Sequence, residues 1–132
     1  MYGFNVVVTG AFATVVDRVT EELKKEGFGV LTDIDVQATL KAKLGAEMRP
    51  YRILGACNPP LAHKAIELEP DIGLLLPCNV IVEETAEGGI LVRIVDPAAM
   101  MRAGGFGGDP VLQEVGGEAE RRLKRVAEAL RS

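Results

Sequence analysis

The sequence contains no tryptophan, and aromatic side chains make up only 5% of its 132 residues. Acidic residues outnumber basic ones, 19 against 15, which gives a formal net charge of −4. Nucleic acids are bound by basic surfaces, and single strands also by stacked aromatic rings. We therefore expect no nucleic-acid partner.

The sequence also lacks the features of a membrane protein. Its apolar stretch from Ile72 to Val82 is interrupted by Pro77 and Asn79 and is much shorter than the ~20 residues that a spanning helix needs. The first residues contain no basic segment ahead of an apolar one, so we expect no signal peptide. These absences predict a cytoplasmic protein that does not associate with membranes.

Cysteine and histidine are scarce, with two and one in the chain respectively. Two cysteines do not build a disulfide scaffold, and this pair lacks the close C-x-x-C spacing of common zinc sites. Hydrophobic residues make up 48% and charged residues 26%, as in ordinary globular domains. The length suits one domain with a sizeable core. We expect a single domain over residues 1–132, with no cofactor and no metal.

The most site-like stretch runs from Arg52 to Val82. It holds both cysteines, the histidine, four of the seven prolines and two of the three asparagines. One strand-like run ends at Cys57 and Asn58, and another begins at Cys78 and Asn79, with a short helix between them. If the two strands are antiparallel neighbours, both Cys-Asn pairs lie at the same end of the sheet.

Runs rich in β-branched residues predict strands, and a periodicity of 3.6 residues predicts helices. The glycine-rich segment 98–108 is predicted to be a flexible surface loop. The C-terminal helical pattern is weakened at Gly116 and Gly117. We expect strands over residues 4–9, 28–36, 51–57, 78–84 and 90–95, and helices over residues 13–26, 37–44, 59–69 and from residue 111 to the end.

Three functional hypotheses use the Cys-Asn residues. The first is a pocket for a small, anionic ligand, in which Asn58 and Asn79 donate hydrogen bonds. The second is thiol chemistry, with Cys57 as a nucleophile or the two cysteines as a reversible disulfide. The third is a soft-metal site of both thiols, His63 and a methionine, which the wide cysteine spacing disfavours. The candidate ligand-binding residues are Cys57, Asn58, His63, Cys78 and Asn79, and no catalytic residue is assigned.

Most of these residues also have a structural interpretation. Free cysteines often fill small gaps in a core, and a single histidine on a helix is often a surface residue. Asn58 is a good N-cap for a helix that begins at Pro59. Asn79 is the strongest site candidate, because an amide within an apolar strand needs a hydrogen-bonding partner.

Two blocks, R-I-L-G-A-C-N-P-P-L-A-H-K-A (52–65) and P-D-I-G-L-L-L-P-C-N-V-I-V (70–82), resemble the core of a known family. This is the bacterial and archaeal domain-of-unknown-function family number three hundred and two. The resemblance covers essentially the whole chain. It implies an α+β domain with a curved, mostly antiparallel sheet and two main helices in the order β-α-β-β-β-β-α, like the TATA-binding protein, with short extra helices. It also implies a homodimer, and the family has no established activity.

The three leucines at 74–76 and the apolar hairpin independently suggest a two-fold interface, because they give more apolar surface than a small sheet easily hides. The sequence therefore predicts a homodimer of uncharacterised function, most simply a small-ligand-binding or sensor module. A thiol-dependent redox enzyme that uses Cys57 and Cys78 is the alternative. A protein-interaction module without a pocket is the third possibility.

Overall fold

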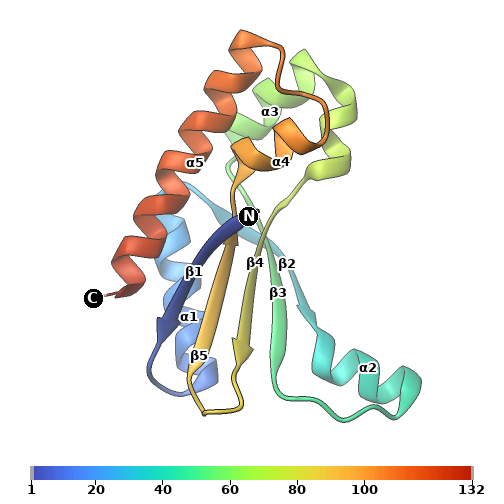
Figure 1. Ribbon diagram of the computed structural model, residues 1–132, viewed down its shortest axis with the longest axis vertical. Helices are drawn as coiled ribbons and strands as arrows, with labels where there is room; N and C mark the ends of the chain where they lie inside the picture. The colour runs from blue at the N-terminus through green and yellow to red at the C-terminus, as the bar shows by residue number, and fades with distance from the viewer. Residues whose placement is uncertain (1, 132) are drawn as a thin grey trace.

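In the computed structural model, which describes residues 2–131, five strands form one curved antiparallel sheet (Figure 1). Its spatial order is β1-β5-β4-β3-β2. The strands are β1 (Gly3–Val8), β2 (Gly29–Asp35), β3 (Tyr51–Cys57), β4 (Cys78–Glu84) and β5 (Ile90–Val95). The helices are α1 (Phe12–Lys25), α2 (Val36–Leu44), α3 (Pro59–Leu68), the 3-10 helix η1 (Pro70–Leu75), α4 (Pro97–Ala103) and α5 (Pro110–Arg131). The predicted α+β class and the β-α-β-β-β-β-α order with short extra helices are confirmed.

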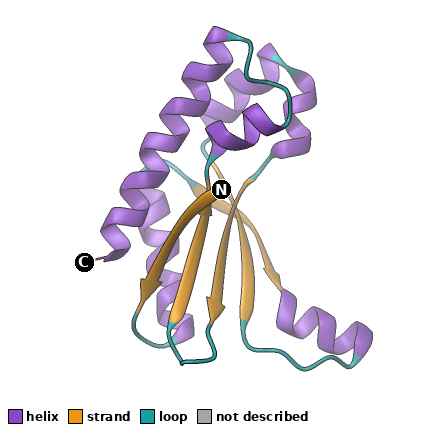
Figure 2. Ribbon diagram, viewed as in Figure 1, coloured by secondary structure: helices purple, strands orange, loops and turns teal. Residues whose placement is uncertain are grey.

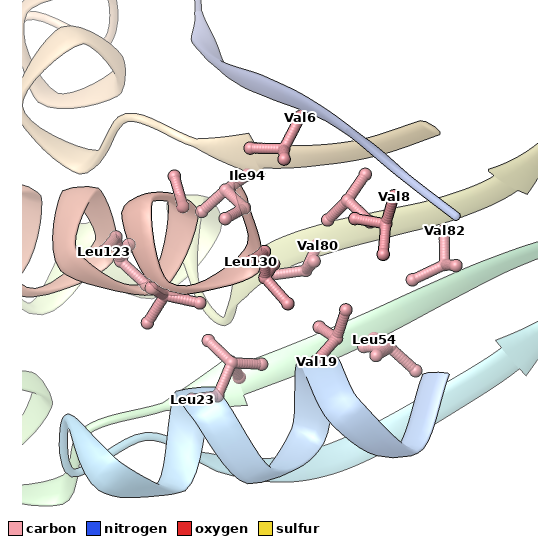
Figure 3. Packing of buried hydrophobic residues seen from close by; sticks show 14 of the residues in the cluster. Val6, Val8, Val19, Leu23, Leu54, Val80, Val82, Ile94, Leu123 and Leu130 are labelled. Carbon is pink, nitrogen blue, oxygen red and sulfur yellow. The ribbon is translucent and has the colours of Figure 1, made fainter. Parts of the chain in front are cut away.

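The main core lies between the sheet and the two long helices. Side chains of α1, among them Val19 and Leu23, and of α5, among them Leu123, point toward the valines of β4 (Figure 3). Val19, Leu23 and Leu123 are all 0% exposed. Burying a side chain of this size stabilises the fold by about 1.5–3 kcal/mol. The opposite face of the sheet is not covered by these helices.

The helices at the upper end of the sheet in Figure 2 form a second unit, which we call the helical lobe. It consists of α3, η1, α4 and the first half of α5. Its own core contains Ala65, Ile72, Leu112 and Val115. Because α5 continues from the helical lobe onto the sheet, one helix contributes to both cores.

Two segments differ from their predictions. Residues 97–103 form α4 rather than a flexible loop, because Asp96 caps the helix by accepting a hydrogen bond from the Ala99 backbone N–H at 3.2 Å. Helix α5 runs unbroken through Gly116. A Cβ on Gly116 would lie 2.7 Å from the Met101 Sδ, so this glycine allows α4 and α5 to pack closely.

The edge strand β2 is more exposed than its alternating pattern predicts. Its register against β3 shifts between Val30 and Thr32, which places Ile34 opposite Ile53. The shift breaks the alternation that would have buried one side of the strand. Helix α2 follows, buries none of its side chains and extends away from the sheet (Figure 1).

Candidate functional site

The two cysteine-bearing strands are antiparallel neighbours, as the site hypothesis requires. In the β3–β4 register, Ala56 lies opposite Cys78 and Gly55 lies opposite Asn79. Both Cys-Asn pairs therefore lie at the end of the sheet beside the helical lobe. The side chains, however, are divided between the two faces of the sheet.

Cys57, Asn58 and Cys78 line one small cavity of about 40 Å³ between the sheet core and the helical lobe. The other lining residues are almost all apolar: Phe28, Ala56, Leu61, Ala62, Ala65, Leu76, Pro97, Met101, Val115 and Ala119. Both cysteines are free thiols of intermediate exposure. The structure thus brings three of the five predicted residues together around one cavity.

The side chain of Asn58 is held in place because it caps the first turn of α3. Its Oδ1 accepts a hydrogen bond from the Leu61 backbone N–H at 3.2 Å, which caps the helix ahead of Pro59. The residue is only 5% exposed. Gly27 allows this burial, because a Cβ at that position would lie 2.9 Å from the Asn58 Nδ2. The predicted N-cap is confirmed, and the oxygen of the amide is already engaged.

The cavity changes the chemistry of Cys78. Burial, together with the nearby charge of a Cys57 thiolate, raises the pKa of Cys78 from 9.0 to about 11. Cys78 therefore remains a protonated thiol at neutral pH. A protonated thiol is a weak nucleophile.

His63 does not join the cavity. Its side chain is 77% exposed on the surface of α3, and its Nδ1 lies 3.5 Å from the Glu67 Oε1 one turn later. The shared face with Glu67 follows from their spacing of four residues. His63 is not among the described residues that line the cavity with the thiols.

Asn79 lies on the open face of the sheet, away from the cavity. There it lines a groove of about 380 Å³, which we call the open-face groove. The side chain is exposed, so its amide reaches solvent instead of needing a partner in the core. The remaining lining residues are Tyr2, Gly3, Asn5, Ile81, Arg93, Ile94 and Val95.

Asn5 and Arg93 also line this groove, and no sequence pattern pointed to either residue. The two residues lie directly opposite each other in the β1–β5 register. Arg93 is also ion-paired with Glu83 of β4. Strand alternation places both side chains opposite the core-facing valines, but only the pairing of β1 with β5 brings them together.

Within residues 2–131, no group of three or more His, Cys, Asp and Glu side chains is arranged to hold a metal ion. No helix in that range is long and apolar enough to cross a membrane.

These features define a small α+β domain with a free open sheet face and a thiol-lined cavity behind it. The chain matches the family described as "Domain of unknown function DUF302" over residues 4–130. The chain is also similar to an uncharacterized conserved DUF302 protein from Bacillus stearothermophilus, whose crystal structure is known. The two sequences are 30% identical, the match covers 99% of each chain, and the TM-score is 0.88. Comparison with curated proteins gave no match. The chain belongs to the DUF302 family, as its sequence blocks predict.

Proposed function

We propose that the protein is a small-ligand-binding module that acts as a homodimer, and that its ligand occupies the open-face groove beside Asn79. The size of the groove carries the proposal. Small-molecule sites enclose about 300–1,000 Å³, and the groove measures about 380 Å³. The cavity at Cys57, at about 40 Å³, is too small for an organic ligand of that kind.

The chemistry of the groove indicates the class of ligand. Asn5, Asn79 and Arg93 supply polar groups, while Tyr2, Ile81 and Val95 supply an apolar floor. A guanidinium has five N–H donors, so the ion pair with Glu83 leaves some of those of Arg93 for a ligand. Among residues 2–131, no aspartate or glutamate lines the groove. These groups suit a small molecule that carries a carboxylate on an apolar body.

Two features support the homodimer. Edge strand β1 contains no charged residue and no proline, whereas natural edges are usually protected by such residues. The other edge, β2, carries Asp33, Asp35 and a register shift. Val7 and Leu74 are 68% and 87% exposed on the single chain, and a second copy would cover apolar surface of this kind.

A thiol-dependent redox enzyme is the second candidate function, because both cysteines line the same cavity. A reversible disulfide needs two thiols that approach each other, and Cys57 is close enough to influence the pKa of Cys78. That pKa, at about 11, opposes the idea of Cys78 as an attacking thiolate at neutral pH. Ligand binding is therefore the better-supported function.

Native mass spectrometry of gently purified protein tests the proposal. We expect a dimer, and a discrete additional mass that is lost from Asn79→Ala and Asn5→Ala. His63→Ala is the control, because that residue lies exposed on α3, and it should keep the added mass. Where no mass copurifies, a panel of small aliphatic and aromatic carboxylates is screened by ligand-observed NMR. A monomer opposes the homodimer. Binding that survives both asparagine substitutions, or no binding in either experiment, opposes the site.

A further inference from the structure

We propose that Cys57, Cys78 and Met101 form a binding site for one soft monovalent metal ion, Cu(I), in the small cavity between the sheet and the helical lobe. The site is distinct from the open-face groove and does not depend on it. The proposal rests on three sulfur-bearing residues that line one cavity, which offers almost no other donor.

The three sulfurs come from three separate elements. Cys57 ends β3, Cys78 begins β4, and Met101 lies on α4. All three residues line the same cavity. The antiparallel register places Cys78 opposite Ala56, the residue before Cys57, and both cysteines line the cavity although twenty residues separate them in the chain.

Gly116 makes room for the sulfur of Met101. A side chain at Gly116 would bring its Cβ to 2.7 Å from the Met101 Sδ. Gly116 lies on α5 next to Val115, which also lines the cavity. The thioether is thus held against α5 by packing instead of being free in solution.

The donor set selects a soft metal. In the described part of the chain, no carboxylate and no histidine lines the cavity, and the Oδ1 of Asn58 already accepts a hydrogen bond from the Leu61 N–H. Thiolates and thioethers favour Cu(I), whereas carboxylates, carbonyls and water suit magnesium and calcium. Zinc most often takes four ligands of nitrogen and sulfur, and three sulfurs alone do not complete that set. Cu(I) is stable with two or three sulfur ligands.

The size of the cavity also supports a site for a single metal ion. A volume of about 40 Å³ admits a single ion and excludes an organic cofactor. Both cysteines are free and partly exposed, so an ion can reach them. Each thiol that binds Cu(I) as a thiolate releases one proton to solvent, and no change in oxidation state is needed.

The test is an anaerobic titration of the reduced protein with Cu(I) in competition with the chromophoric chelator bicinchoninate. We expect one Cu(I) per chain. Loss of an outer-shell partner alone weakens metal affinity by 10–100-fold, so Cys57→Ser and Cys78→Ser should each weaken binding by at least roughly 100-fold. Met101→Leu, which nearly conserves volume, should weaken it by roughly tenfold.

Met48→Leu is the matched control, because Met48 lies in the segment between α2 and β3 and does not line the cavity. It should bind Cu(I) as the wild type does. Circular dichroism of each metal-free variant checks that the fold is intact, and X-ray absorption at the copper edge counts the sulfur neighbours. Absence of competitive Cu(I) binding overturns the site. Equal affinity of Met101→Leu and wild type, or nitrogen and oxygen neighbours in place of sulfur, overturns the three-sulfur assignment.

Asn79→Ala should leave Cu(I) affinity unchanged while it abolishes ligand binding in the groove, which separates the two proposals.

Discussion

Cys78 and Asn79 are neighbours in the chain, yet their side chains lie on opposite faces of the sheet. Cys78 packs toward the helix-covered core and lines the small cavity. Asn79 lines the open-face groove. Because successive residues of a strand point to opposite faces, a Cys-Asn pair that reads as one site in the sequence contributes to two places in the structure.

The thiol of Cys78 should make stability fall at high pH. Its pKa is raised from 9.0 to about 11 in the folded chain, so between these values the folded state holds a proton that the unfolded state has lost. The free energy of unfolding therefore decreases as pH rises through this range, by about 3 kcal/mol in total. Urea unfolding of wild type and Cys78→Ala at several pH values measures the difference. The other ionisable side chains are the same in both proteins, so the difference between the two pH profiles reports Cys78. Parallel pH profiles would contradict the raised pKa.

Asn58→Ala should lower the free energy of unfolding by about 0.5–2 kcal/mol, because it removes the N-cap of α3. The lost hydrogen bond joins the Asn58 Oδ1 to the Leu61 backbone N–H. Asn58→Asp keeps a capping oxygen and tests whether the cap or the amide nitrogen matters more. Chemical denaturation of the three proteins gives the comparison. Wild-type stability in Asn58→Ala would show that the cap contributes nothing.

Gly55→Ala should destabilise the fold by about 1–3 kcal/mol, as overpacking does. A Cβ there would lie 2.1 Å from the Thr32 Oγ1 and 2.8 Å from the Pro77 Cγ. Gly29→Ala is the matched control, since nothing lies within 4 Å of its added Cβ. Thermal denaturation compares the two variants. If Thr32→Ala fails to recover part of the loss in the double variant, the contact with Thr32 is not its cause.

Leu123→Ala should cost about 2–5 kcal/mol, because it opens a cavity in the main core. Leu123 is 0% exposed, whereas Leu44 on α2 is 75% exposed. The same substitution at Leu44 should change stability by no more than about 0.5 kcal/mol. Urea denaturation of both variants measures the contrast. Similar losses at the two positions would mean that α2 is covered in solution, for example by a second copy of the chain.

The sequence by itself determined most of the secondary structure. The strand Tyr51–Cys57 has the bounds that its pattern predicts. Asn58 caps α3, as its place ahead of Pro59 predicts. These features depend on neighbours within a few residues, so local periodicity and capping preferences suffice to predict them. The α4 helix was missed because its glycine-rich continuation dominated the pattern. Asp96 ahead of Pro97 is a local start signal for this helix, whereas its close packing against Gly116 of α5 is a tertiary contact that no local pattern reports.

Only the tertiary structure decided which candidate residues lie at the cavity, which at the open-face groove and which on the surface. The sequence predicted one site of five residues. The strand pairing instead places Cys57, Asn58 and Cys78 at the cavity and leaves His63 on the surface. Asn79 joins Asn5 and Arg93 in the groove only because β5 pairs with both β1 and β4. Residues far apart in the chain meet through long-range strand pairing, and the face on which each lies depends on a register that a one-residue slip would reverse.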